Sequence, residues 1–306
     1  MSKIVNAIIG HVIGDTLGGP YELFTRDKMK IYPAKDIMRT SKYSDDSAMT
    51  LATMRSITDN NGIIDYEDIM YEFYLWLAYG KHTPDNTPYG YSGTVFDSVN
   101  KFSLGYDPLK CGNPSEYCNG NGALMRIIPF ILYLYKTGAD DSKIYETIKN
   151  ATLLTHAHKH NLMGTYIFTR FCLFLLNGYS KEESYKMVRE LDYKILFDKS
   201  TIEKYNRIIK RNLIDCKEDD ILSGMAVWET LEAVLWSILH SNSFKTAILT
   251  AVNLGGDTDT VGAITGDVAG IIYDEIPKDW TKKIKGFKTI KKDAEKFEKV
   301  LDDLVE

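Results

Sequence analysis

Residues 254–270 read LGGDTDTVGAITGDVAG, in which aspartates and threonines alternate after a pair of glycines. Gly262, Gly266 and Gly270 recur at every fourth position, a spacing that places all three on one face of a helix. An interior glycine costs about 1 kcal/mol of helix propensity relative to alanine, so a compensating contact is expected. Because glycine lets another backbone approach closely, the stretch predicts a buried helix that packs tightly against a neighbour.

A second glycine row near the start of the chain has the same spacing, at Gly10, Gly14 and Gly18. Such rows also occur in membrane helices. Here His11, Asp15 and Asp267 interrupt segments that are too short to span a bilayer, which argues against a membrane protein. We therefore expect two core helices in tight contact, and these helices can lie close to a functional site.

Helical periodicity dominates the rest of the chain. Apolar stripes with the helix period occur in residues 69–77, 231–239 and 247–252. Ser243 is a suitable N-cap for the last stripe. Alternating runs typical of strands are absent, and the proline and glycine residues of segment 80–122 predict long loops with little regular structure. The prediction is an all-α fold in a single domain that spans residues 1–306.

The composition narrows the class of protein. With 306 residues and 44% hydrophobic content, the chain can bury a large core. The formal net charge of −5 argues against a protein that coats nucleic acid. The first residues lack a signal-peptide pattern, and four cysteines without a CxxC pair favour a reducing cytoplasm. The lysines between residues 282 and 292 are expected to form a solvated helix face.

Two acidic clusters are candidates for binding cations. Asp257, Asp259 and Thr260 offer only oxygen ligands, which suit Mg²⁺ or Mn²⁺ better than zinc. Residues 44–47 read SDDS and open a helical pattern, and for this cluster alone N-capping is the better explanation. A cap uses one side-chain oxygen, whereas residues 257–260 offer four oxygen-bearing side chains. Together the two clusters favour a two-metal hydrolytic site assembled from distant segments.

Five segments, in order along the chain, carry a resemblance to a known family. They are residues 9–22 (IGHVIGDTLGGPYE), 43–47 (YSDDS), 119–126 (NGNGALMR), 154–158 (LTHAH) and 255–263 (GGDTDTVGA). The chain resembles the ADP-ribosylglycohydrolase family, whose members remove ADP-ribose from modified side chains or related conjugates. Residues 276–280 (IPKDW) also look like the end of the family's sequence.

The resemblance implies a compact orthogonal bundle of helices around a cleft that holds two Mg²⁺ or Mn²⁺ ions. The metal ligands that it implies are Ser44, Asp45, Asp46, Asp257, Asp259 and Thr260. Ser44 replaces the threonine of the family motif and keeps its hydroxyl. Catalytic roles fall on Glu22, Asp45 and Asp259, with Glu22 near the scissile bond as general acid or base.

For the substrate, the resemblance implies that the Asn-Gly loop lines the ADP-ribose cleft. The implied contacts are Asn119, Gly120, Asn121 and Gly122. The glycines leave room for a pyrophosphate to approach backbone N–H groups, and a plain turn is the alternative. His156 is interpreted as a substrate-contacting or loop-anchoring residue, and Tyr91 as a candidate to stack on adenine. Residues 88–94 depart from arginine-specific relatives, which carry an aspartate in a comparable loop.

The predicted function is metal-dependent hydrolysis of the glycosidic bond between ADP-ribose and a modified acceptor. The expected partner is an ADP-ribose-modified protein or a related conjugate, and a monomer is favoured. One alternative is a binding or structural relative without turnover, which the competent ligand positions and Glu22 argue against. The other is an unrelated two-metal phosphohydrolase, which the lack of a His-Asp dipeptide argues against. The acceptor stays open between arginine, serine, another side chain, a base and a metabolite.

Overall fold

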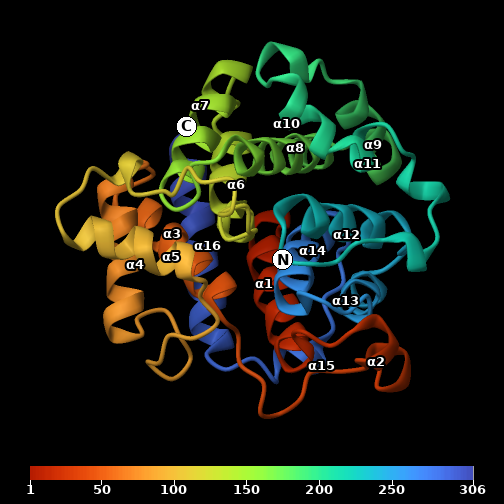
Figure 1. Ribbon diagram of the computed structural model, residues 1–306. Coiled ribbons are helices and arrows are strands. Elements are labelled where there is room, and N and C mark those ends of the chain that lie inside the picture. The colour runs from red at the N-terminus through yellow and green to blue at the C-terminus, as the bar shows by residue number, and fades with distance from the viewer. Residues whose placement is uncertain (306) are drawn as a thin grey trace.

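The computed structural model describes residues 1–305, which form helices joined by loops (Figure 1). These residues contain no strand, and two isolated bridges join Asn113 to His156 and Gly120 to Ala226. The prediction of an all-α fold is confirmed. The α-helices are α1 (Lys3–Gly18), α2 (Arg26–Ile31), α3 (Asp45–Asp59), α4 (Tyr66–Tyr79), α5 (Gly93–Ser103), α6 (Ile128–Lys136), α7 (Asp141–Leu153), α8 (Lys159–Leu176), α9 (Lys181–Glu190), α10 (Lys199–Lys204), α11 (Asn206–Ile209), α12 (Val227–Leu239), α13 (Phe244–Asn253), α14 (Thr258–Ile272), α15 (Lys278–Thr281) and α16 (Phe287–Asp303). Short 3₁₀ turns are η1 (Gly19–Tyr21), η2 (Pro108–Lys110), η3 (Leu124–Arg126), η4 (Tyr193–Ile195), η5 (Leu213–Asp215) and η6 (Glu218–Asp220).

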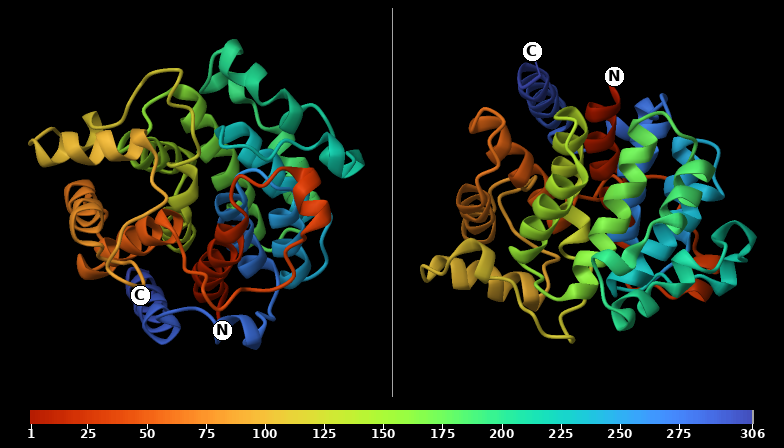
Figure 2. Two further views of the ribbon diagram at one scale, coloured as in Figure 1. Left: turned by 60° about the horizontal axis from the view of Figure 1, so that its bottom comes forward. Right: turned by 90° about the horizontal axis from the view of Figure 1, so that it is seen from above.

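The centre of the molecule is the contact between α1 and α14, which run side by side in Figures 1 and 2. A Cβ atom on Gly14 would lie 1.9 Å from the carbonyl oxygen of Gly262. One on Gly266 would lie 2.0 Å from the carbonyl oxygen of Gly10, and the remaining glycines of both rows meet backbone in the same way. Only glycine fits at such separations, so the prediction of two core helices in tight contact is confirmed.

Three helices begin where the sequence predicts. Ser44 caps α3, and its hydroxyl accepts a hydrogen bond from the backbone N–H of Asp46. Ser243 caps α13 in a reciprocal capping box with Thr246. Asp257 precedes α14 without a side-chain cap bond, which leaves both of its carboxylate oxygens available for other partners. Two of these helix starts are those that carry the acidic clusters.

The prediction of long loops across residues 80–122 is wrong between Gly93 and Ser103, where α5 forms. The Ser92 hydroxyl accepts a hydrogen bond from the N–H of Val95 and caps this helix. Val95 and Val99, one turn apart, are buried against the rest of the molecule. This apolar pair after a good cap was a helical signal that the proline and glycine content around it concealed.

The outer helices cover the central pair. α12 and α13 pack against α14, and α16 packs against α1 and α3 (Figure 2). On α16 the residues Ile290, Ala294, Phe297 and Leu301 are buried at helical spacing. Lys288 and Lys292 are exposed on its outer side, which confirms the solvated lysine face in this helix. Lys282 and Lys285 are also exposed but lie before the helix begins.

Within residues 1–305, no helix is both long enough and apolar enough to cross a membrane. The four cysteines are free thiols. The cytoplasmic location stays a prediction from cysteine content.

Candidate active site

The two acidic clusters, distant in sequence, meet where α3 and α14 begin. Carboxylate oxygens of Asp15, Asp46 and Asp259 lie within 4.8 Å of one another, and so do those of Glu22, Asp257 and Asp259. The four aspartates are all buried, and Glu22 is half-buried. Asp259 belongs to both groups, so the carboxylates form one continuous cluster.

The start of α3 is held in place by Asp15 of α1. The Asp15 carboxylate accepts hydrogen bonds from the backbone N–H groups of Ser44 (2.9 Å) and Ser47 (3.0 Å). It also accepts the hydroxyl of Ser47 at 2.6 Å. The sequence reasoning gave Asp15 no role at the site. Asp15 is the one carboxylate of α1 and follows directly after Gly14 in a mostly apolar stretch, which was the signal that a buried partner exists.

The start of α14 is held mainly by backbone contacts. Gly255 and Gly256 adopt φ angles of 73° and 80°, which favour glycine. The N–H of Gly256 donates to Phe24 O, and the N–H of Leu23 donates back to Gly256 O, both at 2.8 Å. These two bonds hold the chain that directly follows Glu22 beside the start of α14. The side-chain amide of Asn121 then donates to Asp257 Oδ2 at 2.6 Å.

The electrostatics of the cluster favour a bound cation. Burial raises the pKa of Asp45, Asp46 and Asp259 well above the ordinary range, and the neighbouring carboxylates raise it further. Asp46 Oδ1 is buried and has no hydrogen-bond partner within residues 1–305. The Ser44 hydroxyl donates to the other oxygen of Asp46 at 3.0 Å. Oxygen donors in this arrangement suit a hard divalent ion.

Three of the predicted ligands, Asp46, Asp257 and Asp259, have carboxylate oxygens in the two carboxylate groups. Ser44, Asp45 and Asp46 lie at the start of α3, and Asp257, Asp259 and Thr260 lie at the start of α14. Asp45 belongs to neither of the two carboxylate groups, and its Oδ1 faces Gly90, where an added Cβ atom would lie 2.5 Å from it. Thr260 is buried in the first turn of its helix.

Glu22 borders the cluster from the loop after η1. Burial raises the pKa of its carboxyl group, and the charges of Asp257 and Asp15 raise it further. A raised pKa keeps a carboxyl group protonated closer to neutral pH, as a general acid requires. The position and the environment of Glu22 both suit proton transfer.

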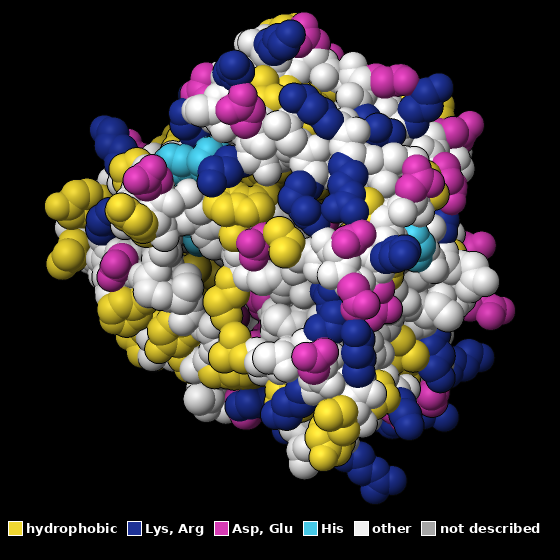
Figure 3. Space-filling model, turned by 45° about the vertical axis from the view of Figure 1, so that its right-hand side comes forward, with side chains coloured by type: hydrophobic (Ala, Val, Ile, Leu, Met, Phe, Trp, Pro, Cys, Tyr) yellow, Lys and Arg dark blue, Asp and Glu magenta, His cyan; other side chains and the backbone are white. Residues whose placement is uncertain are grey.

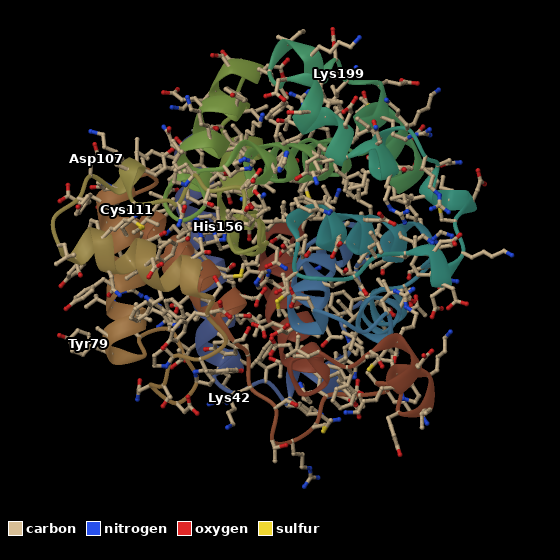
Figure 4. All side chains as sticks on the ribbon, in the orientation of Figure 1. Lys42, Tyr79, Asp107, Cys111, His156 and Lys199 are labelled. Atoms are coloured by element: carbon tan, nitrogen blue, oxygen red, sulfur yellow. The ribbon has the colours of Figure 1, made fainter. Side chains whose placement is uncertain are left out.

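The predicted Asn-Gly loop lies over His156. The two asparagines are almost fully buried and hold protein groups, since Asn119 O accepts from Val227 N at 2.9 Å and Asn121 donates to Thr230 and Asp257. A Cβ atom on Gly122 would lie 2.7 Å from the His156 ring. His156 is 1% exposed and lies near the middle of the molecule in Figure 4. The His156 ring therefore packs directly against the loop, and its two predicted roles stay open.

Comparison with known proteins agrees with this geometry. The sequence model of the ADP-ribosylglycohydrolase family matches residues 1–305. The chain belongs to the ADP-ribosylglycohydrolase family. The predicted enzyme class, a hydrolase acting on the glycosidic linkage of ADP-ribose, is confirmed as that of the family.

Several curated relatives of this family member match along most of its length. The ADP-ribosylarginine hydrolase Tri1 of Serratia proteamaculans is 26% identical over 297 residues, which are 93% of this chain and 75% of the relative. The ADP-ribosyl-(dinitrogen reductase) glycohydrolase of Rhodospirillum rubrum is 25% identical, covering 92% and 90% of the two chains. Human ADP-ribosylhydrolase ARH3 is 22% identical, covering 94% and 90%.

A solved structure shows the same fold. It is described as an ADP-ribosylglycohydrolase-related protein complex, and it superposes with a TM-score of 0.78 over 98% of both chains at 22% identity. The compact helical bundle predicted from the resemblance is thus confirmed for this family member.

In this ADP-ribosylglycohydrolase, the loop of residues 88–94 lies against Asp45 at Gly90, and the Tyr89 hydroxyl donates to Lys42 O at 2.6 Å. Burial raises the pKa of Tyr89, and the charges of Asp15 and Asp259 raise it further. Tyr91 packs against Trp76 and Phe96 instead, with ring centroids 5.6 and 6.2 Å away. It belongs to a group of exposed hydrophobic side chains between residues 71 and 106, on the side of α4 and α5 (Figure 3). The role of Tyr91 as an adenine contact stays a prediction.

A buried pair links α1, α14 and α3 behind the cluster. His11 Nδ1 lies 2.9 Å from Asp267 Oδ1, and His11 Nε2 lies 3.3 Å from the hydroxyl of Thr50. All three side chains are fully buried. The sequence reasoning used His11 and Asp267 only to argue against a membrane helix. Because α1, α14 and α3 all supply site residues, the contacts of His11 with Asp267 and Thr50 hold these helices in position around the site.

Proposed function

We propose that this chain releases ADP-ribose from a modified protein side chain with two divalent cations, Mg²⁺ or Mn²⁺, bound where α3 and α14 begin. The observation that supports this most is the convergence of buried carboxylates from three helices. Without a cation, these carboxylates repel one another and their burial is costly. The unpartnered oxygen of Asp46 is one group that a cation would satisfy.

The ions would be held by the predicted oxygen ligands. These are Ser44, Asp45, Asp46, Asp257, Asp259 and Thr260. When bound, the two ions would orient the ribose hydroxyls and lower the pKa of a water molecule that attacks the anomeric carbon. Asp15 and Asn121 position the ligands, since Asp15 holds the start of α3 and Asn121 holds Asp257.

Glu22 would supply the proton for the leaving group. The glycosidic bond breaks through an oxocarbenium-like transition state, in which protonation of the leaving atom lowers the barrier. Burial and the nearby carboxylates raise the pKa of the Glu22 carboxyl group, which favours its protonated form. As Leu23 and Gly256 share a backbone hydrogen bond, Glu22 stays fixed relative to Asp257.

We propose an ADP-ribosylated protein as substrate, because several relatives are named for such substrates. Tri1 is named for ADP-ribosylarginine, and the Rhodospirillum enzyme for ADP-ribosylated dinitrogen reductase. Residues 88–94 of this chain contain no aspartate, whereas the resemblance implies one in a comparable loop of arginine-specific relatives. A panel of substrates linked through arginine and through serine tests the acceptor directly.

The deciding experiment is ADP-ribose release from that panel by the purified protein, before and after removal of metal with EDTA. We expect release by the untreated protein, loss after EDTA, and recovery with Mg²⁺ or Mn²⁺. Full activity of the metal-free protein would contradict the metal mechanism. Binding of ADP-ribose without release would favour a relative that has lost turnover, and phosphate release from nucleotides alone would favour a phosphohydrolase.

A further inference from the structure

Arg126 is a fully buried cation without a carboxylate partner. It ends η3, directly after the Asn-Gly loop, and is 0% exposed. Its Nη2 donates to Ala151 O at 3.1 Å and to the Thr155 hydroxyl at 2.7 Å. Within residues 1–305, its Nε and Nη1 have no partner, although the guanidinium lies 5.0 Å from the centre of the Phe73 ring. Burial lowers the pKa of Arg126 to about 9, so the side chain stays charged at neutral pH.

A buried and unpaired charge is costly, so a compensating role is expected. The packing contact with Phe73 and the bond to Ala151 O would satisfy a purely structural residue. A leucine or methionine would pack there without the cost of burying a charge. Arg126 differs from a purely structural residue in its second hydrogen bond, which it donates to the Thr155 hydroxyl. That hydroxyl is in turn hydrogen-bonded to His156 Nδ1.

Thr155 determines which nitrogen of His156 carries the proton. A guanidinium can only donate, so the Thr155 oxygen accepts from Arg126. Its remaining neighbour is His156 Nδ1 at 2.9 Å. If Nδ1 carried the proton, the buried Thr155 hydroxyl hydrogen would have no acceptor within residues 1–305. The hydroxyl therefore donates to Nδ1, and the ring proton is on Nε2.

His156 is also kept neutral. Burial and the charge of Arg126 lower its pKa to about 3. The ring then carries a single proton, at Nε2, and this atom has no hydrogen-bond partner within residues 1–305. A neutral imidazole whose other nitrogen is occupied can present only a donor on its free edge.

The free edge of His156 faces the Asn-Gly loop. A Cβ atom on Gly122 would lie 3.3 Å from Nε2, and one on Gly120 would lie 3.9 Å from it. Within residues 1–305, the backbone N–H groups of Gly120 and Gly122 donate to no other group. Three unpaired donors thus lie close together, at His156 Nε2 and on the backbone of Gly120 and Gly122. Grouped backbone and side-chain donors of this kind suit an anion.

We infer that Arg126 and Thr155 are positioning residues that hold His156 in its neutral Nε2–H form, so that the loop and the ring present only donors to a diphosphate. The inference rests on the proposed function, because ADP-ribose supplies the diphosphate. The positive charge acts through two hydrogen bonds and never touches the ligand. A chain of this kind strengthens the terminal donor, since each hydrogen bond polarises the next.

The test compares Thr155→Val, which removes the hydroxyl at nearly constant shape, with Thr155→Ser, which keeps it. Thr152→Val is the matched control, because Thr152 is equally buried and its hydroxyl bonds Ile148 O and Thr165 away from His156. The measurements are the dissociation constants of ADP-ribose and of adenosine with Mg²⁺ present, and the nitrogen NMR shifts of His156.

We expect Nδ1 of the wild type to be unprotonated. Thr155→Val should weaken ADP-ribose binding about tenfold through loss of an oriented donor, with adenosine unaffected. Thr155→Ser should restore wild-type binding, and Thr152→Val should change neither ligand. A protonated Nδ1 in the wild type, or equal weakening by Thr152→Val, would overturn the inference. A wild type that does not bind ADP-ribose at all would contradict the proposed function instead, because the NMR shifts still report the tautomer.

Discussion

The two halves of the carboxylate cluster are built by different means. The α3 half is positioned by a side chain, since Asp15 accepts the backbone N–H groups of Ser44 and Ser47. The α14 half is positioned by the chain itself, through paired backbone bonds around Gly256 and a contact of Asp257 N with Ser223 O. The α3 half should therefore depend on the side chain of Asp15, whereas the α14 half should tolerate side-chain changes around it.

The two halves also differ in the charge that their supporting groups add to the cluster. Asp15 orders α3 but adds another carboxylate to the cluster, and its charge raises the pKa of Asp45 and Asp46. The backbone bonds of the α14 half add no charge. Asp15 thus both orders the α3 half of the ligands and adds to the negative charge that a cation would neutralise. The order of α3 is therefore coupled to metal binding.

The largest effect is expected where the halves meet, at Asp259. This residue belongs to both carboxylate groups, so Asp259→Asn removes a charged oxygen from each. We expect turnover to be abolished and Mn²⁺ binding to be lost, measured by ADP-ribose release and by titration of the metal. Asp274→Asn, an exposed change beyond the end of α14, is the control and should leave both unchanged. Retained turnover in Asp259→Asn would show that the halves act independently.

Glu22→Gln should have the next largest effect, a loss of about 10²–10⁴-fold in turnover with metal binding intact. Glu22 is attached to the α14 half through the Leu23–Gly256 hydrogen bond. Because its pKa is raised, its protonated form persists toward neutral pH and disappears as the pH rises further. The wild-type rate should fall through that range, and the residual rate of Glu22→Gln should not. Wild-type turnover in Glu22→Gln would contradict the proton-transfer role of Glu22 but not the proposed metal site.

Much of this architecture could be predicted from local sequence patterns. The two glycine rows predicted the contact of α1 with α14, and Ser44 and Ser243 marked helix starts. Such signals are local because spacing and capping act over a few residues. The residue types of the two acidic clusters already favoured one site built from distant segments, and the resemblance then supplied the full set of predicted ligands.

What the sequence did not reveal depends on contacts between distant segments. Asp15 appears as an isolated acid until α3 is placed beside it. Similarly, Arg126 was only part of a motif, and its burial against Thr155 requires the packing of the following helices. The role of Tyr91 in residues 88–94 stays a prediction, because a loop has no period that shows which side chain faces inward.

Asp15→Asn should weaken metal binding about 10–100-fold, the usual range for a residue that supports the ligands. An amide has one acceptor oxygen, and its NH₂ group would oppose an N–H of Ser44 or Ser47. In the α14 half, Asn121→Ala should cost less, since the backbone of Asp257 remains bonded to Ser223. Titration with Mn²⁺ compares the two variants. A larger loss in Asn121→Ala would reverse the comparison between the halves.

The smallest effect on activity is expected at His11, which contacts α14 through Asp267 and α3 through Thr50 but no metal ligand. Burial alone would lower the pKa of His11, but the charge of Asp267 and the hydrogen bond to it raise it to about 9. At Asp267, burial raises the pKa more than the charge and hydrogen bond of His11 lower it. The pKa of Asp267 is about 6, so Asp267 is ionised above that pH. Between pH 6.5 and 9, His11 is therefore the member of this pair whose charge changes.

A histidine with a raised pKa stabilises the fold fully below its unfolded pKa, and this contribution is lost as the pH rises through the folded value. The wild type should therefore lose stability between pH 6.5 and 9, by on the order of 3 kcal/mol for this pair. His11→Gln should remove that part of the slope while keeping near-wild-type turnover at neutral pH. Thermal unfolding at both pH values with saturating Mg²⁺ measures it, with the exposed His240→Gln as control. An unchanged slope in His11→Gln would show that the charge of His11 does not join the two halves, and that the glycine contact between α1 and α14 suffices.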